Sequence, residues 1–164
     1  MQEAKQAQPS NAQRPEFEIL AQFIKDLSFE SPSTPQIFFE KNLQAQPSLN
    51  VNLEVKTQKI GEEIYEAILT VKVNNTIEQK PLFIVDLSYG AVVAIHTKDE
   101  EKIKNYITKT TPAHLFPFIR EIVAALTRES GFAPFVLAPI DFSQVAFQQT
   151  AAPGTAPQAP VNKA

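Results

Sequence analysis

Apolar and polar residues alternate along four separate stretches of the chain, and this period of two predicts four β-strands. The clearest stretch runs from Leu49 to Val55, with apolar residues at the odd positions and polar residues between them. Similar alternation occurs over 17–29, 64–73 and 81–95. The phase of the first stretch shifts after Phe23, which predicts a bend or a bulge in that strand.

The order of these stretches favours an antiparallel meander with one face exposed to water. Asn74 and Asn75 predict the turn into the fourth strand, and Gly90 predicts a kink or bulge within it. The fourth strand is apolar on both faces, so it needs cover on both sides. One short chain supplies little cover, and the pattern therefore favours self-association.

Two helices are expected after the strands. Acidic residues at 99–101 open a short polar helix, and Pro112 is expected to separate it from the main helix. The main helix is expected to begin near Pro117 and to end at Ser130–Gly131. Its apolar stripe has helical spacing and consists of Ile119, Ile122, Val123 and Leu126. The predicted fold class is α+β.

Length and composition indicate one domain with loose ends. The chain has 164 residues, 12 of them phenylalanine, with no cysteine or tryptophan and two histidines. Residues 1–14 and 150–164 are rich in Gln, Ala, Pro and Asn without apolar periodicity, so both tails are expected to be disordered, leaving a folded domain at 15–149. So many phenylalanines with so few catalytic side chains indicate a protein that holds something apolar.

Charge and targeting signals limit the classes of partner and the cellular location that we expect. The net charge is −3, without a basic run, so nucleic acid is an unexpected partner and a basic peptide a better one. The start of the chain lacks an apolar signal core, and the most apolar stretch is too short to span a bilayer. These features predict a cytoplasmic protein without direct membrane insertion.

The residue pattern does not predict a catalytic centre, a cofactor or a metal. His96 and His114 lack the spacing of metal ligands and are expected to be surface or capping residues. The glycines match no nucleotide-binding motif. An enzyme would depend on carboxylates, with Asp86 and Asp141 as the plausible reagents of a small hydrolase. A second alternative is a lipid carrier whose phenylalanines enclose a cavity.

Asp86 is the residue that most needs an explanation. A carboxylate between Val85 and Leu87 in a strand is expected to be paired or exposed for use. By composition alone, a salt bridge to a neighbouring lysine is the favoured interpretation. Asp26 and Glu30 form a second acidic spot, which on pattern alone is a solvated strand end.

Four segments of the chain resemble the bacterial protein-export chaperone family SecB over roughly residues 16 to 147. They are Lys25–Glu30 (KDLSFE), Val85–Leu87 with Gly90–Ala91, Leu115–Glu121 (LFPFIRE) and Leu137–Phe142 (LAPIDF). The resemblance implies a four-stranded antiparallel sheet with a long helix, assembled as a homotetramer that is a dimer of dimers. It also implies an ATP-independent holdase that binds unfolded precursor proteins in apolar grooves and passes them to the export motor SecA.

The resemblance further implies roles for individual residues. Asp26, Glu30, Ile84 and Asp86 would form the surface on which the basic, zinc-holding tail of SecA docks. Val85, Leu87 and Tyr89 would lie at the interface between dimers. The client groove would be lined by Phe29, Phe38, Leu43, Phe83, Phe116 and Phe118, and for each of these core packing is an equal alternative. The sequence departs from the family around Leu43–Pro47 and Asn105–Ala113, which affects the expected shape of the groove.

Overall fold

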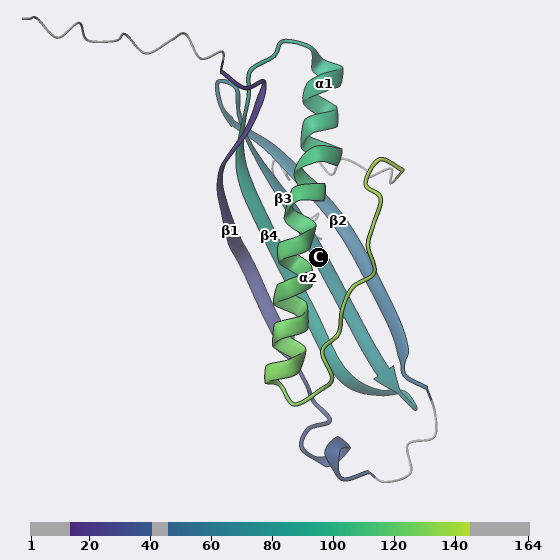
Figure 1. Ribbon diagram of the computed structural model, residues 1–164. Helices are drawn as coiled ribbons and strands as arrows, with labels where there is room; N and C mark the ends of the chain where they lie inside the picture. Colours follow the sequence, from purple (N-terminus) through teal and green to yellow (C-terminus); the bar gives the residue numbers. More distant parts are fainter. Residues whose placement is uncertain (1–13, 41–45, 145–164) are drawn as a thin grey trace, which may run out of the picture.

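The computed structural model describes residues 14–40 and 46–144, which form one twisted antiparallel sheet with helices on one face (Figure 1). The predicted α+β fold is confirmed. The elements in chain order are the strand β1 (Phe17–Glu30), the short helix η1 (Gln36–Phe38), and the strands β2 (Ser48–Gly61), β3 (Ile64–Ile77) and β4 (Lys80–Ile95), followed by the helical segments α1 (Glu100–Asn105), η2 (Tyr106–Thr110) and α2 (Thr111–Glu129).

The strand order across the sheet is β1-β4-β3-β2. Strands β2, β3 and β4 form the expected meander, whereas β1 pairs with β4 and lies at the opposite edge from β2. The segment between β1 and β2 therefore crosses from one edge of the sheet to the other. Alternation within single strands carries no information about this pairing, so the pattern could not have predicted it.

The expected irregularity in β1 is confirmed, but Gly90 has a different role from the one predicted. Register shifts interrupt the β1–β4 ladder between Ile19 and Ala21 and between Ile24 and Asp26. At Gly90 the pairing with both neighbouring strands continues without a shift. A Cβ atom there would lie 2.6 Å from Ile68 Cδ1 and 2.9 Å from the Phe23 ring, so the glycine makes room for side chains of the flanking strands.

The turn between β3 and β4 lies four residues later than predicted. Asn74 and Asn75 pair with Ile84 and Phe83 inside the ladder. The chain reverses instead at Glu78 and Gln79, both of which have positive φ (48° and 66°). Glutamate and glutamine rarely adopt the left-handed conformation, so the sequence carries no turn signal at the true turn. Asn74 and Asn75 are typical turn residues, and for that reason they misled the prediction.

The helical region is continuous, so the predicted break at Pro112 and the predicted start near Pro117 are both wrong. The π-helical segment η2 joins α1 directly to α2, with the Thr111 N–H bonded to the Tyr106 carbonyl. Pro112 lies in the first turn of α2, where a missing N–H costs little, and Pro117 lies inside the helix. The π-turn absorbs the misfit that would otherwise end the helix.

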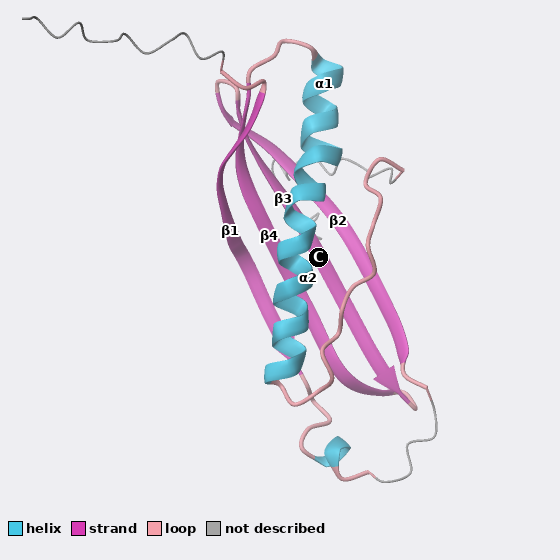
Figure 2. Ribbon diagram, in the orientation of Figure 1, coloured by secondary structure: helices cyan, strands magenta, loops and turns pink. Residues whose placement is uncertain are grey.

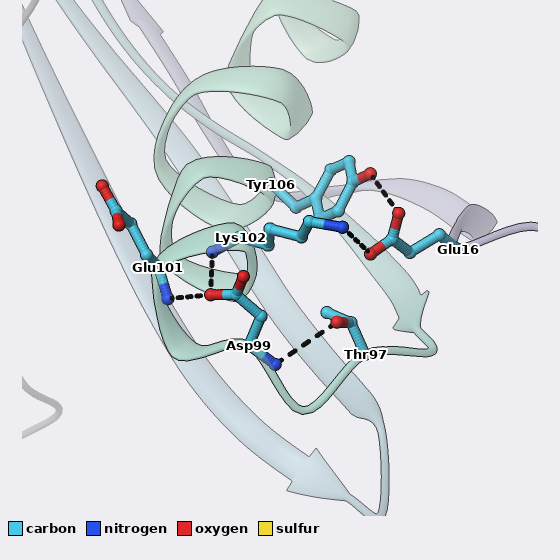
Figure 3. Close-up of polar contacts among 6 residues, drawn as sticks. All are labelled: Glu16, Thr97, Asp99, Glu101, Lys102 and Tyr106. Carbon is cyan, nitrogen blue, oxygen red and sulfur yellow. Dashed lines mark hydrogen bonds and ion pairs between the residues drawn. The ribbon is translucent and has the colours of Figure 1, made fainter.

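The first turn of α1 is fixed to the beginning of β1 (Figure 3). Asp99 caps α1 by accepting hydrogen bonds from the backbone N–H groups of Glu101 and Lys102. The Lys102 ammonium and the Tyr106 hydroxyl reach the carboxylate of Glu16 at 2.9 and 3.3 Å. The hydrogen bond from Lys102 lowers the pKa of Glu16, so this carboxylate is charged at neutral pH and ties the helix to the sheet edge.

The predicted end of the main helix is confirmed at Gly131. This glycine has φ 86°, its N–H bonds to the Arg128 carbonyl, and the Phe132 N–H bonds to the Thr127 carbonyl. These two bonds are those of a Schellman cap, and the left-handed residue suits glycine. The cap turns the chain back towards the sheet.

After α2 the chain runs back as an extended segment, residues 132–142, beside the helix (Figure 2). Two side chains of α2 hold it. The Arg120 guanidinium donates to the Leu137 carbonyl at 2.8 Å, and the hydroxyl oxygen of Thr127 accepts from the Phe135 N–H at 2.8 Å. We call residues 132–142 the return segment.

The hydrophobic core lies between the sheet, α2 and the return segment. The odd-numbered residues of β4 point into it, and Val85 and Leu87 are completely buried there. They pack with Leu115, Ile119 and Val123 of α2 and with Leu137 and Phe142 of the chain beyond it. Within the described part of the chain, none of the helices is both long and apolar enough to cross a membrane.

Thr127→Val is expected to lower the free energy of unfolding by about 1–3 kcal/mol, because the half-buried N–H of Phe135 loses its acceptor, the buried Thr127 hydroxyl, while the side-chain volume barely changes. Thr108→Val is the matched control, since that hydroxyl only donates to the Lys104 carbonyl in the preceding helical turn. Urea unfolding at a fixed protein concentration measures both. An equal loss in the two variants would show that Thr127 does not anchor the return segment.

Candidate functional site

The face of the sheet opposite α2 brings the four predicted docking residues together. In the β1–β4 ladder, Glu30 pairs directly with Ile84. The next two pairs whose side chains lie on the same face are Ser28 with Asp86 and Asp26 with Ser88. Side chains two residues apart share a face, so all six lie on the side away from the helix. We call the outer face the surface made by Asp26, Ser28 and Glu30 of β1, Ile84, Asp86 and Ser88 of β4, and the residues of β3 and β2 in the same rows.

Asp86 is both ion-paired and accessible. It lies opposite Lys72 of β3, and its carboxylate receives the Lys72 ammonium at 2.8 Å. The hydrogen bond and the charge of Asp86 raise the pKa of Lys72. The side chain of Asp86 keeps 32% of its surface and that of Lys72 keeps 59%. The salt bridge expected from composition is therefore present, within the surface that the family resemblance assigns to docking.

Asp26 and Glu30 supply two further carboxylates on the neighbouring strand. Both are exposed. Within residues 14–40 and 46–144, no lysine, arginine or histidine lies within ion-pair distance of either one. Three carboxylates on two adjacent strands, with one lysine beside them, make this part of the outer face acidic.

A shallow hollow of about 240 Å³ lies beside the Lys72–Asp86 pair. Its lining comes from three strands and comprises Asn50, Lys72, Val73, Asn74, Ile84, Val85 and Asp86. Sequence reasoning identified Ile84 and Asp86 but not Lys72, Asn50 or Asn74. These three could be found only from the register of β2, β3 and β4, which the alternation pattern does not specify.

The predicted interface residues Val85, Leu87 and Tyr89 lie on the helix-covered face. Val85 and Leu87 have no exposed surface in the protomer, and Tyr89 keeps 9%. The Tyr89 ring stacks on Phe118 of α2 at 5.9 Å between centroids. In this protomer, the side chains of Val85 and Leu87 have no surface with which to contact a second subunit directly.

Exposed apolar residues do lie next to them, at the edge between β1 and α2. Ile24 pairs with Tyr89 and is 49% exposed, and Leu27 pairs with Leu87 and is 37% exposed. Phe118 is 48% exposed on the helix above. We call Ile24, Leu27 and Phe118 the edge patch.

The predicted groove residues divide into core and surface. Phe83 and Phe116 are buried at 2% and 4% exposure, and Phe29 is half-buried against Phe83 with ring centroids 6.0 Å apart. Phe38 and Phe118 are exposed at 50% and 48%. Leu43 lies outside the described residues. Phe38 and Phe118 are therefore the described groove candidates that are most accessible to a ligand.

The sequence analysis did not identify several further exposed apolar residues as candidates for the groove. Phe39 is the most exposed of them at 77%, and Leu49 and Val51 at the start of β2 are 46% and 39% exposed. Alternation predicted a dry face for β2, but only Val55 is fully buried there. The reason is geometric, because a helix about 10 Å wide covers two to three strands spaced about 4.8 Å apart and leaves the edge of the sheet bare.

The Phe38 ring forms one end of a chain of aromatic contacts. It packs on Phe132 at 5.2 Å, Phe132 packs on Phe83 at 5.5 Å, and Phe83 packs on Phe135 at 6.1 Å between centroids. These rings fill the space between the sheet and the return segment by contacting one another. This arrangement does not favour the lipid-carrier alternative, which needs rings around an empty cavity.

The residues of the hydrolase alternative are not brought together. Asp86 lies on the outer face, whereas Asp141 lies in the return segment on the opposite side of the sheet, where it accepts hydrogen bonds from Ser143. His96 pairs with Glu63, and His114 contacts the Thr110 carbonyl of its own helix. The described residues contain no group of three metal-ligating side chains.

Comparison with known proteins gives a consistent result. The family model described as Preprotein translocase subunit SecB matches residues 10–153. The chain is 38% identical to the protein-export protein SecB of Zymomonas mobilis over 83% of this chain and 81% of that protein. It is 40% identical to the SecB of Rhodospirillum rubrum over 76% of each chain.

The fold is also found among solved structures. A SecB-like chaperone of Mycobacterium tuberculosis, solved with a peptide from the HigA1 antitoxin, superimposes with a TM-score of 0.63. The match covers 76% of this chain and 91% of the mycobacterial protein at 16% sequence identity. At that identity the likeness concerns the fold.

Proposed function

This chain belongs to the SecB family of protein-export chaperones, and we propose that it is an ATP-independent holdase for non-native precursor proteins. It keeps them competent for translocation and delivers them to the motor SecA. It works as a homotetramer, a dimer of dimers, in the cytoplasm. The alternatives of a hydrolase and a lipid carrier have no comparable support.

The observation that carries this proposal is the large apolar surface that the folded protomer leaves in water. Among the described residues, ten large hydrophobic side chains remain at least 37% exposed. They are Leu20, Ile24, Leu27, Phe38, Phe39, Leu49, Val51, Ile60, Phe118 and Val136. Apolar surface on this scale indicates contact with other chains.

Two groups of these residues support two kinds of contact. The client patch, which we define as Phe38, Phe39, Leu49 and Val51, lies at the end of the sheet where β2 begins (Figure 1). It combines exposed aromatic rings with the bare edge of β2, whose backbone groups could pair with an extended chain. The edge patch lies on the other edge strand, β1, and on the adjoining part of α2, and it is the candidate for contact between protomers.

Binding by such patches needs no nucleotide. Burying one apolar side chain contributes about 1.5–3 kcal/mol before entropic costs, too little to hold a chain. Four protomers would offer several patches to one long segment, which raises the overall affinity through effective concentration. By mass action, a protein that binds only unfolded chains opposes their folding, and folded proteins escape because their apolar residues are hidden.

Delivery to SecA is proposed for the outer face. Asp26, Glu30 and Asp86 present carboxylates on two adjacent strands, and Ile84, directly opposite Glu30, adds an apolar surface beside them. An acidic face of this kind suits a basic, zinc-holding tail. Clients and SecA would then bind on different sides of the same sheet, so neither needs to displace the other.

The first expected outcome concerns holding. The purified protein should suppress aggregation of an unrelated denatured protein without nucleotide, as measured by light scattering. Phe39→Ser should weaken this suppression, because the ring is 77% exposed and its loss removes a contact without disturbing the core. Gln36→Ser, an exposed polar change in the same turn, is the control. A protein that leaves aggregation unchanged is not a holdase.

The second concerns docking. Asp86→Lys should weaken binding of the zinc-loaded SecA tail peptide by at least about tenfold, because it replaces an attraction by a repulsion and places two lysines opposite each other. Calorimetry at low and high salt measures it, and the difference should shrink with salt. Glu62→Lys, the same charge change in the β2–β3 turn, is the control. Equal affinities for Asp86→Lys and the parent protein would refute the docking surface.

The third concerns assembly. Ile24→Lys should shift the protein from tetramers to smaller species, since it places a charge in the edge patch on a side chain that is already half exposed in the protomer. Ile60→Lys makes the same change at an equally exposed position on the opposite edge strand and should leave the assembly intact. Sedimentation velocity at micromolar protein decides between them. A tetrameric profile for both variants would remove the edge patch from the interface.

A further inference from the structure

The geometry of the outer face points to a regulatory role for Lys72. We propose that Lys72 is a built-in competitor of the basic partner: it occupies Asp86 while the outer face is empty and thereby limits how tightly a lysine- or arginine-rich tail docks. This inference rests on the proposed docking function of the outer face. It adds a residue that sets the strength of docking without contacting the client.

The competing pair is formed by the fold itself. Lys72 and Asp86 are direct cross-strand partners in the β3–β4 ladder, and their charged atoms lie 2.8 Å apart. The backbone therefore delivers an internal cation to the same carboxylate that a basic partner would seek. A partner must either displace this ammonium or bind beside it against its repulsion.

The three docking carboxylates differ in this respect. In the described parts of the chain, Asp26 and Glu30 have no ion-pair partner, whereas Asp86 is already neutralised by Lys72. The first contacts with a basic tail are therefore available at β1. The contact at β4 becomes available only when Lys72 moves.

Lys72 has the freedom to move. Its side chain is 59% exposed and belongs to the outer face, so its displacement opens no part of the core. The hollow of about 240 Å³ beside the pair is lined by Asn50 and Asn74, whose amide groups can accept a displaced ammonium. The charge of Glu54 on β2 also favours the protonated form of Lys72.

The test measures the affinity of the zinc-loaded SecA tail peptide by calorimetry. Lys72→Gln removes the internal cation and should tighten binding about two- to fivefold, the range expected for one exposed ion pair. Lys72→Arg keeps the competitor and should bind like the parent protein. Lys56→Gln is the matched control, because it removes a lysine of similar exposure from the outer face, four residue pairs further along the β2–β3 ladder.

A double variant separates competition from overall charge. If Lys72 acts by occupying Asp86, the gain from Lys72→Gln should disappear in an Asp86→Asn background. A gain that persists there, or one matched by Lys56→Gln, would overturn the competitor role. Unchanged affinity of Lys72→Gln would do the same, and the proposed docking function would still stand if Asp86→Lys weakens binding. Failure of the parent protein to bind the peptide at all would overturn both.

Discussion

The organising constraint of this fold is that one helix covers a sheet too wide for it. Four strands about 4.8 Å apart need more cover than a helix about 10 Å wide provides. The return segment extends the cover, held by Arg120 and Thr127, and the core forms beneath both. The start of β2, the η1 turn and the open edge of β1 remain bare. The exposed apolar patches follow from this mismatch.

The same sheet separates two kinds of surface through the parity of one strand. Odd residues of β4 build the core, and even residues build the outer face. A change at one position therefore acts on one side only, provided the register is kept. Gly90 illustrates how closely the outer face is packed, since Ile68 and Phe23 fill the space above it. Binding and stability can thus be altered almost independently on the two sides.

The sequence was sufficient for features that depend on local pattern. Alternation predicted the four strands, the phase shift predicted the β1 irregularity, and Gly131 predicted the end of α2. Features that depend on which strands pair with each other could not be predicted from the sequence. The pairing of β1 with β4, the position of Lys72 opposite Asp86 and the exposure of Leu49 all follow from register and from limited helical cover. The Pro112 signal failed because a π-turn relieved it.

A holdase without nucleotide must bind well enough to delay folding and weakly enough to let go. The apolar patches that we propose for client binding would meet this requirement, because each contact is modest and the overall affinity comes from their number. The acidic outer face shows the same property in electrostatic form. An exposed carboxylate paired with its own lysine exchanges one ion pair for another when a basic partner arrives, so the net gain is small. In the proposed roles, both surfaces would favour exchange over tight capture, and a chaperone that passes its cargo onward depends on reversible binding.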